Sequence, residues 1–464
     1  MPHQTPHIID PNKVFLINYS EIEGKLNPEQ YHKERINAIE KIKGTGSYMP
    51  LSSIASFSKE TTTIIKQGET YVGLENISSE YGEYIETTEK QSISSAAIFG
   101  KGDILFPKLR PYLNKVFYAT FDGICSTEFY VLRTNMVNAE YLSIFLRSSL
   151  VVNQTKHLMT GNTLPRLQTE DVKDLLIPVP SKDTQQKIID YNTSAYNKRR
   201  EKMQYASLLL QGIDGYLLSE FKIQLQNIEP DLRHRILVIN KNSLVSRLDP
   251  IFYNADIKMF TQCTYSERLS NLVFSFENGF AVGRQNQVEE GNGIIQIRPT
   301  NIDNNGRLKY DKNVYVPEME DIPFVESGVV LFNNTNSQEW VGKTTYFANE
   351  DDRKVYISNH ITAITVDRSK ILPEYLCAIL NMYQRHKIFY SICTNWNNQS
   401  GIGLDLLKSL HIPLFTDDRQ ESLRRQQQIV DKMNAIYQEA DECILSANRI
   451  INEAKAKIES MIIG

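Results

Sequence analysis

Gln185-Gln186-Lys187-Ile188-Ile189 returns later in the chain as Gln426-Gln427-Gln428-Ile429-Val430, and each copy opens a helical pattern. From Gln426 to Ile463 no Pro or Gly occurs, and apolar residues recur at alternating four- and three-residue steps. That spacing predicts a coiled-coil seam of about five heptads, roughly 50 Å long at 1.5 Å per residue. The seam residues are Ile429, Met433, Ile436, Ala440, Cys443, Ala447, Ile450, Ala454 and Met461.

The first copy carries the same seam less cleanly. Gly212 and Gly215 lie within it, and each weakens a helix by about 1 kcal/mol relative to Ala. Two seams in one chain most simply pack on each other, and the alternative is that each helix covers only its own domain. Small residues on the second seam favour close helix–helix contact. The first seam consists of Ile188, Ala195, Met203, Ala206, Leu210, Ile213, Leu217 and Phe221.

The repeat extends well beyond the two helices. Its matches occur in the same order in both halves, and their offset drifts from 222 to 241 residues, as loop insertions would produce. We therefore infer an internal duplication. The further matches pair Lys13–Asn18 with Arg235–Asn240, Leu26-Asn27-Pro28 and Tyr31 with Leu248-Asp249-Pro250 and Tyr253, Gly102–Phe106 with Gly328–Phe332, Glu140–Leu142 with Glu374–Leu376, and Leu175 and Ile177-Pro178 with Leu410 and Ile412-Pro413.

Each copy begins with about 180 residues of mixed strand and helix patterns and ends in its long helix. The fold class is therefore predicted as α+β: two mixed α/β domains related by pseudo-two-fold symmetry and separated by two long antiparallel coiled-coil helices. The predicted boundaries are 1–180 for the first domain, 181–230 for the first helix, 231–420 for the second domain and 421–464 for the second helix.

Composition excludes several classes of protein. The 464 residues are 41% hydrophobic and 23% charged, which is ordinary for a globular chain and excludes a mostly disordered one. The net charge of −4 excludes a histone-like protein but not a sequence reader with a local basic groove. No apolar run reaches the roughly 20 residues that span a bilayer, and the N-terminus lacks a secretory pattern. We expect a cytoplasmic protein without membrane contact, whose five widely spaced cysteines are reduced thiols rather than metal ligands.

Three motifs that suggest catalysis are incomplete. The Asn27-Pro28 and Asp249-Pro250 turns lack the second proline of an amino-methyltransferase motif, and no Gly-rich loop accompanies them. Gly342-Lys343-Thr344 lacks the preceding glycine of a phosphate-binding loop, because Ser337 stands at that position. Glu453-Ala454-Lys455 lies on the helical pattern and is more simply a solvated face. We therefore expect a non-catalytic chain with no metal site.

Polar loops beside the predicted strands are the candidate binding elements. Asn and Gln can bond an adenine edge, and Arg and Lys a guanine edge or a phosphate, although any single loop is more often a solvated turn. The two copies keep their framework residues but diverge here, which suits two sites that read different short sequences. The candidates in the first copy are Glu75, Asn76, Lys108, Arg110, Tyr112, Asn114, Lys115, Asn162 and Arg166. Those in the second are Arg298, Asn301, Asn333, Asn334, Asn336, Lys343, Trp396, Asn397, Asn398 and Gln399.

The chain contains Gly102–Leu105, then Lys108–Leu113 and then Phe121–Phe129. With these stretches and their counterparts in the second copy, it resembles the specificity subunit of type I restriction–modification enzymes. The resemblance covers nearly the whole chain and its two-domain, two-helix layout. One departure is that the family commonly has Glu-Gln before the long helix, where this chain has Gln185-Gln186 and Gln426-Gln427. The stretches that carry the resemblance are Gly102–Leu105, Lys108–Leu113, Phe121–Phe129, Asn334–Ser337, Val341–Lys343 and Ile412-Pro413.

The resemblance implies a function. Two target-recognition domains would each read half of a bipartite, asymmetric double-stranded DNA site, and the helices would set the gap. Two methyltransferase subunits would dock on the helices and modify one adenine per half at N6. S-adenosylmethionine, ATP and Mg would be needed only in such partner subunits, and the sequence leaves open whether restriction subunits join. The alternative is a two-domain scaffold or adaptor that does not bind DNA.

Overall fold

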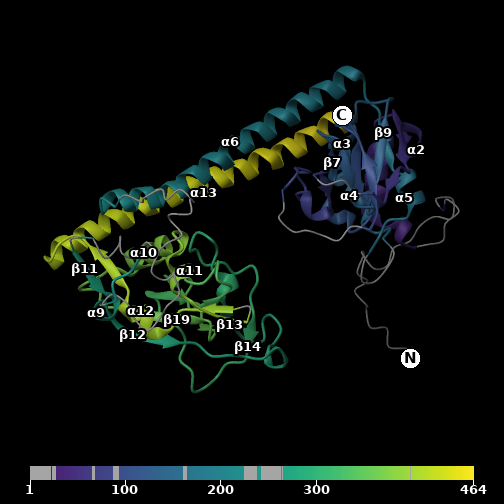
Figure 1. Cartoon of the computed structure of the whole chain (residues 1–464). Helices are drawn as coiled ribbons and strands as arrows, with labels where there is room; N and C mark the ends of the chain where they lie inside the picture. The colour runs from purple at the N-terminus through teal and green to yellow at the C-terminus, as the bar shows by residue number, and fades with distance from the viewer. Residues whose placement is uncertain are drawn as a thin grey trace, which may run out of the picture. The chain divides into compact units, whose positions relative to one another are not determined.

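The computed structural model describes residues 22, 28–64, 68–86, 94–159, 165–223, 238–241, 263, 265–397 and 399–464. Contacts divide the chain into two units: Met1–Met203 with Leu445–Gly464, and Gln204–Ile444. The matched segments 13–18 and 248–253 lie outside the described residues, as do residues 235–237 and Leu26-Asn27. The remaining matches can be compared directly, one unit at a time (Figure 1).

The first unit combines short strands with helices and contains one end of each long helix. The long helices are α6 (Lys182–Glu220) and α13 (Arg419–Ile463). The other elements are η2 (Pro28–Tyr31), α1 (Lys33–Gly44), β1 (Tyr48–Pro50), α2 (Leu51–Ile54), β2 (Ala55–Ser58), β3 (Thr61–Thr62), β4 (Tyr71–Val72), η3 (Leu74–Asn76), β5 (Ala96–Phe99), β6 (Ile104–Pro107), η4 (Pro111–Leu113), β7 (Phe117–Tyr118), β8 (Gly123–Cys125), β9 (Phe129–Thr134), α3 (Ala139–Leu146), α4 (Ser149–Thr155), α5 (Thr169–Lys173) and β10 (Leu176–Pro178).

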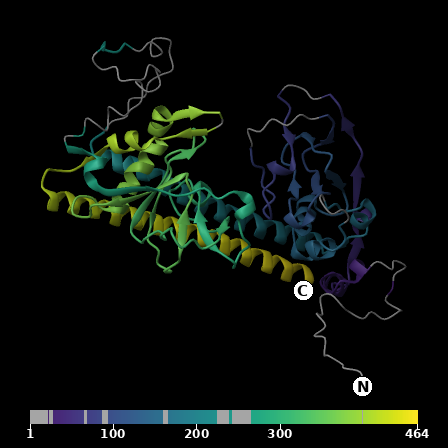
Figure 2. The same cartoon turned by 90° about the horizontal axis from the view of Figure 1, so that it is seen from below.

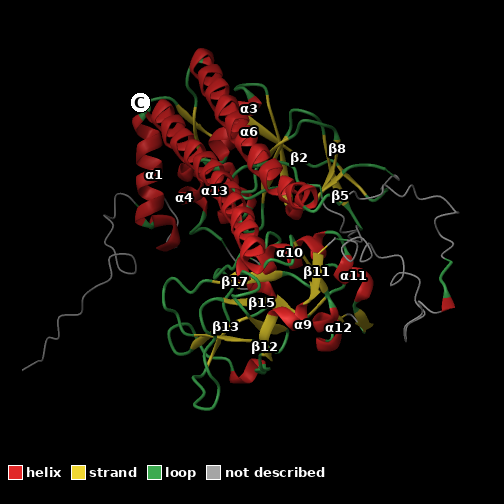
Figure 3. Ribbon diagram, turned by 90° about the vertical axis from the view of Figure 1, so that its left-hand side faces the viewer, coloured by secondary structure: helices red, strands yellow, loops and turns green. Residues whose placement is uncertain are grey.

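The second unit follows the same plan with a few additions, and in it helix α10 (Pro373–Arg385) lies beside the strands β15 (Val329–Asn333) and β17 (Thr344–Phe347) (Figure 3). Its elements are β11 (Tyr265–Arg268), α9 (Leu269–Leu272), β12 (Val273–Asn278), η7 (Arg284–Asn286), β13 (Ile294–Ile297), η8 (Pro299–Asn301), β14 (Tyr315–Val316), β15 (Val329–Asn333), β16 (Thr335–Asn336), β17 (Thr344–Phe347), β18 (Val355–Ile357), β19 (Ile361–Val366), α10 (Pro373–Arg385), α11 (Ile388–Ile392), β20 (Thr394–Trp396), β21 (Gln399–Gly401), α12 (Leu404–Ser409) and β22 (His411–Leu414).

The central sheets of the two units have the same strand order. It is β2-β9-β6-β7 in the first unit and β12-β19-β15-β17 in the second, antiparallel throughout. The strand β6 is buried on both faces. Successive side chains of a strand point to opposite sides, so neighbouring residues of β6 enter different cores. Ile104 and Phe106 enter the core that contains the helices, and Leu105 enters the core against the second sheet. The strand β15 does the same: Val330 and Phe332 enter the core that contains the helices, and Leu331 enters the core against the second sheet. The duplicated Gly-x-x-Leu-Phe stretch therefore forms an equivalent framework strand in each unit.

The other duplicated motifs fix each domain to the start of its long helix. The Tyr141 hydroxyl donates to the carbonyl of Pro178 (3.0 Å), and the Tyr375 hydroxyl donates to that of Pro413 (2.7 Å). Both tyrosines are fully buried, where an unpaired hydroxyl would cost free energy. The repeated Glu-Tyr-Leu and Ile-Pro stretches therefore form one interaction in each unit.

The duplicated glutamines have an equally specific role. Gln185 Oε1 accepts a hydrogen bond from the backbone N–H of Asn138 (2.8 Å), the residue that caps α3. Gln426 Oε1 accepts one from Leu372 (2.9 Å), which caps α10. Both side chains are buried, so the Gln-for-Glu departure from the family leaves the helix start joined to its domain.

The two long helices pack on each other in both units, as predicted, and both views show them side by side (Figure 1, Figure 2). In the first unit Ala195 packs with Ile451 and Ala454. In the second unit Ile213 shares a core with Met433, and the Tyr205 hydroxyl donates to Glu439 Oε1 (2.6 Å). Residue numbers rise along α6 as they fall along α13, so the pairing is antiparallel in each unit.

The seam is confirmed at most of its positions and differs at two. Ile451 rather than Ile450 is fully buried, and Ile462 rather than Met461 is buried at the end of the helix, while Ile458 takes the seam position that the heptad gives to Lys457, as expected. A 3.6-residue helix drifts from a strict heptad, which moves the buried stripe by one position toward the end. α6 ends at Glu220, before the predicted limit of 230. None of the helices among the described residues is both long and apolar enough to cross a membrane.

Candidate nucleic-acid interface

In the first unit two predicted loops meet at the end of β6. Leu109 pairs with Arg166 in an isolated antiparallel bridge, and the backbone N–H of Arg110 donates to the Pro165 carbonyl (3.0 Å). The backbone of Lys108 accepts a hydrogen bond from Leu167 (3.0 Å). The segments 108–115 and 165–167, more than 50 residues apart in sequence, thus form a single surface.

The second unit brings its two loops together in the same way at the end of β15. Thr335 and Asn336 of β16 pair with β21, and β21 pairs with β20, so the sheet order is β16-β21-β20. The hairpin that contains Trp396 and Gln399 therefore lies beside the Asn333–Lys343 loop. We call the two surfaces the first tip (108–115 with 165–167) and the second tip (333–343 with 394–401).

The first tip presents an exposed arginine, Arg110, to solvent. Arg110 is exposed, and its backbone is held in the left-handed region (φ 47°) directly before Pro111. Within the described part of the chain its guanidinium has neither a hydrogen bond nor an ion pair. Tyr112, two residues on, is 45% exposed. A fixed backbone with a free guanidinium and an aromatic ring can contact a base edge or a phosphate.

The other basic residues of the first tip already have partners. Arg166 forms a bidentate ion pair with Glu128 (3.0 and 2.8 Å), on the side of the tip that faces solvent. Lys108 donates to the Thr127 carbonyl (2.6 Å) and lies 4.8 Å from the ring centre of Tyr130. Burial lowers the pKa of Lys108. Arg110 is therefore the cation of this tip that is most available to a ligand.

The second tip is built from amides and tryptophans instead of cations. Trp396 is 58% exposed, and Asn397 and Gln399 beside it are exposed as well. Trp340, which the sequence analysis did not select, is 40% exposed and has the Lys343 ammonium 5.6 Å from its ring centre. An exposed tryptophan within a polar loop was the signal available for it, because large exposed aromatics often mark binding surfaces.

Below these exposed groups, amides of the second tip bond to one another. Asn333 is fully buried and donates to the carbonyls of Thr335 (2.9 Å) and His360 (3.1 Å). Asn336 donates to Asn333 Oδ1 (2.9 Å), and Asn334 donates to Thr362 Oγ1 (2.9 Å). These three carboxamides hold the shape of the loop.

Several candidates in both units stabilise the framework rather than face solvent. Asn76 is buried, accepts from the Gly73 N–H (2.8 Å) and donates to the Ile85 carbonyl (3.1 Å). Asn301 holds the equivalent turn: it accepts from the Arg298 N–H (2.9 Å) and donates to Lys309 (2.9 Å).

Lys115 and Lys343 form a second equivalent pair. Lys115 lies two residues before Phe117, which faces Leu105 of β6. Lys343 lies two residues before Thr345, which faces the matched Leu331 of β15. Lys115 donates to the Leu74 carbonyl (2.8 Å), and Lys343 donates to the Ile302 carbonyl (2.6 Å). Both ammonium groups therefore hold the short 3₁₀ turn of their own unit. A phosphate-binding role for Gly342-Lys343-Thr344 has no support here, since this ammonium is directed inward.

The remaining candidates occupy intermediate positions. Asn114 is buried and donates to the Arg147 carbonyl (2.7 Å), while Glu75 is half-buried on η3. Arg298 donates to Gln296 Oε1 (3.2 and 2.9 Å), and burial lowers its pKa. Asn162 and Asn398 lie outside the described residues.

Comparison with known proteins identifies the first domain. Residues 47–202 match the model of the type I restriction modification DNA specificity domain. This stretch of the chain is therefore similar to that domain family. It includes the strands β1 to β10, the helices α2 to α5 and the whole first tip described above.

The similar proteins agree with this assignment. The chain is 29% identical over 91 residues to the type I restriction enzyme EcoDI specificity subunit of Escherichia coli, a match that covers 20% of each chain. It is 31% identical over 105 residues to the HindI specificity subunit of Haemophilus influenzae, covering 21% of this chain and 23% of the relative. These matches span about a fifth of the length of each relative. The resemblance predicted from the sequence is confirmed.

Structural comparison extends the fold likeness to nearly the whole chain. A solved chain from a study of complex assembly and conformational transition of the type I R-M system aligns with a TM-score of 0.51 at 18% identity. The alignment covers 89% of this chain and 96% of the other. The α+β class, with two mixed domains and a pair of long helices, is thereby confirmed.

Proposed function

We propose that this chain is the non-catalytic DNA-reading subunit of a type I restriction–modification complex. Each unit reads one half of a bipartite, asymmetric site through its tip, and the paired helices set the gap between the halves. Methyltransferase subunits, which supply S-adenosylmethionine, bind the chain and modify an adenine at N6 in each half. Any restriction subunit that joins the complex brings its own ATP and Mg, and the protein acts in the cytoplasm.

One observation carries this proposal. The two units use the same buried hydrogen bonds to build the same framework, yet they expose different chemistry at equivalent places. A cation and a tyrosine suit a guanine edge or a phosphate, whereas amides and a tryptophan suit an adenine edge and apolar base surfaces. Two unlike readers on one scaffold fit an asymmetric site, and the match of residues 47–202 to the model of a DNA specificity domain supports DNA as the ligand.

A domain exchange tests the proposal most directly. Residues 13–180 are replaced by the corresponding segment of another specificity subunit, leaving Gln185 and the rest of α6 unchanged. The modified sequence, determined by mapping methylated adenines in cells, should change in one half only. The reason is that the exchanged residues contain the whole first tip and none of the second.

The matched control is the reciprocal exchange of the second domain, residues 265–414, which should change the other half. An unchanged methylated sequence in both chimeras would reject the assignment. Purified complexes then give the salt dependence of binding, where a DNA reader loses about 0.9 log units of affinity per log unit of salt for each phosphate neutralised. A slope near zero would favour the scaffold alternative.

A further inference from the structure

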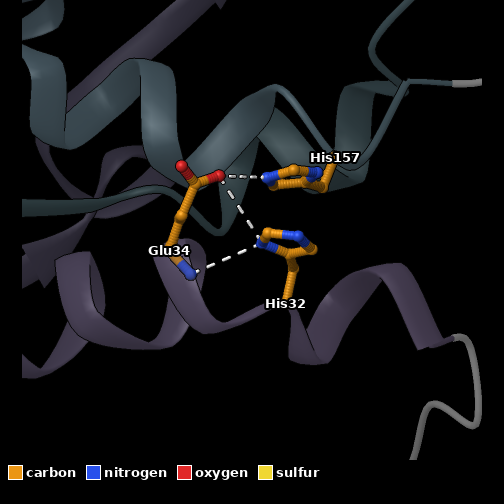
Figure 4. Close-up of side chains that lie close together, drawn as sticks. All are labelled: His32, Glu34 and His157. Atoms are coloured by element: carbon orange, nitrogen blue, oxygen red, sulfur yellow. Dashed lines mark hydrogen bonds and ion pairs between the residues drawn. The ribbon is translucent and has the colours of Figure 1, made fainter. Parts of the chain in front are cut away.

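A cluster of metal-binding side chains lies away from both tips, where α1 meets the end of α4. His32 caps α1, Glu34 lies in the first turn of α1, and His157 follows α4 (Figure 4). One ligand atom from each of these residues lies within 4.8 Å of the other two. His157 is more than 120 residues from His32 and Glu34 in the chain, so the fold, and not local sequence, brings it to the other two.

The distances between the ligand atoms of the cluster are close to those between ligands of a bound metal ion. Glu34 Oε2 lies 2.8 Å from His157 Nε2 and 3.6 Å from His32 Nδ1. Tetrahedral ligands about 2.1 Å from a zinc ion are roughly 3.4 Å from each other, a value that falls between the two. Two imidazoles and one carboxylate form a ligand set used for zinc sites that keep a fourth position for water.

The arrangement of the rings also brings the two imidazoles close together. Their ring centres are 3.5 Å apart with an interplanar angle of 19°. An imidazole binds a metal in its own plane, so coordination tilts the rings out of this stack. His32 and His157 are 18% and 24% exposed in their side chains, and Glu34 is 47% exposed, which leaves an open path for an ion and a water ligand.

One basic residue competes for the same carboxylate. Lys156 Nζ lies 2.6 Å from Glu34 Oε2, where it neutralises the charge that a metal would use. The backbone N–H of Glu34 also donates to His32 Nδ1, over a long 3.4 Å. Both interactions would give way on metal binding, and the lysine sets how tightly the metal is held.

We propose that His32, Glu34 and His157 bind a zinc ion that fastens α1 to the end of α4. The wide spacing of the cysteines predicted no metal site. The available signal was a His-x-Glu at a helix start, which gains meaning only when the fold places a second histidine opposite. Zinc at this position stabilises the packing of α1 on the rest of the first unit, because an ion that binds only the folded state raises the stability of that state.

The test measures zinc binding to the full chain after removal of metals with a chelator. Titration calorimetry with ZnCl₂, and visible absorption with Co²⁺ as a spectroscopic substitute, should show one saturable site. Losing a single ligand, in His32→Ala, His157→Ala or Glu34→Gln, should weaken binding by roughly 100-fold or more. Lys156→Met should tighten it, because the competing ammonium is removed.

His360→Ala provides the matched control, since that histidine lies in the second unit, and it should leave binding unchanged. Zinc should also raise the Tm of the wild type and of Lys156→Met but not that of the three ligand variants. Glu34→Gln keeps the shape of the side chain and remains informative if a histidine variant folds poorly. No saturable binding by the wild type, or equal binding by wild type and Glu34→Gln, would overturn the proposal.

Discussion

The two units share several buried polar contacts and differ in the residues that they expose. Asn76 and Asn301 hold equivalent turns, and Lys115 and Lys343, which precede the strands β7 and β17, donate into those turns. The tips differ: the first tip exposes Arg110, and the second tip exposes Trp396. A duplicated domain has therefore retained its interior and changed its surface.

Free energy explains this division. A buried amide or ammonium that loses its partner costs about 1–3 kcal/mol or more, so both copies must keep such pairs to remain folded. An exposed side chain in a loop has no such constraint, and it can change with the ligand. The comparison predicts that substitutions below the tips act alike in both units, and substitutions on the tips act on one half-site alone.

The largest effects are expected at the paired asparagines. Asn301→Ala removes a buried carboxamide that makes hydrogen bonds to Arg298, Lys309 and Asn313, and should lower the free energy of unfolding of its unit by about 2–4 kcal/mol. Asn76→Ala should lower that of the first unit by a similar amount. Chemical denaturation of the full chain, followed by probes in each unit, measures both.

Asn292→Ala is the matched control, because Asn292 is exposed and, among the residues that the structure describes, only its backbone forms a hydrogen bond. It should change stability by less than about 0.5 kcal/mol. A large loss for Asn301→Ala with none for Asn76→Ala would break the equivalence of the two frameworks.

The sequence predicted the framework well because duplication doubles the signal. The Glu-Tyr-Leu, Ile-Pro and Gln-Gln stretches correspond to hydrogen bonds that recur in both units, from Tyr141 to Pro178 and from Tyr375 to Pro413. The helix seam followed from apolar spacing, and only its end differs, where Ile462 is buried in place of Met461.

The candidate site was harder to predict, because residue type does not reveal where a side chain points. Lys343 and Asn333 have ideal chemistry for nucleic acid, yet their polar groups bond to the protein. Which lysine is exposed depends on strand register and on contacts with segments distant in sequence. The sequence did select Arg110 and Trp396, which the fold leaves exposed, but it could not separate them from their buried neighbours.

The second prediction distinguishes the two tips. Arg110→Ala should weaken DNA binding by about 1–3 kcal/mol and relax one position of the first half-site only, if the guanidinium contacts a base edge. Trp396→Ala should cost roughly 1–2 kcal/mol and affect only the second half-site, because a large exposed aromatic contributes contact area. Binding to a panel of single-base variants of the DNA site measures both.

Arg110→Lys is the informative control for the first tip. Lysine keeps the charge but loses the planar, bidentate donor geometry. If Arg110 contacts a base, Arg110→Lys should lose discrimination nearly as fully as Arg110→Ala. If Lys restores affinity for every sequence equally, Arg110 contacts a phosphate, and the first tip reads its bases through other residues.

The smallest effect concerns the two long helices, which also differ from each other. α6 contains Gly212 and Gly215, whereas α13 has no glycine before its end. Both glycines are exposed, and a Cβ added at either position would meet no atom within 4 Å. Gly212→Ala and Gly215→Ala should therefore each raise the free energy of unfolding by up to about 1 kcal/mol, since Ala restricts the unfolded chain. Calorimetric Tm values check this, with Ala206→Gly, a substitution at a buried position of the same helix, expected to shift Tm the opposite way. If the double Gly→Ala variant were no more stable but bound DNA or its partner subunits less well, the glycines would serve an interface, and α6 and α13 would differ in function as well as in sequence.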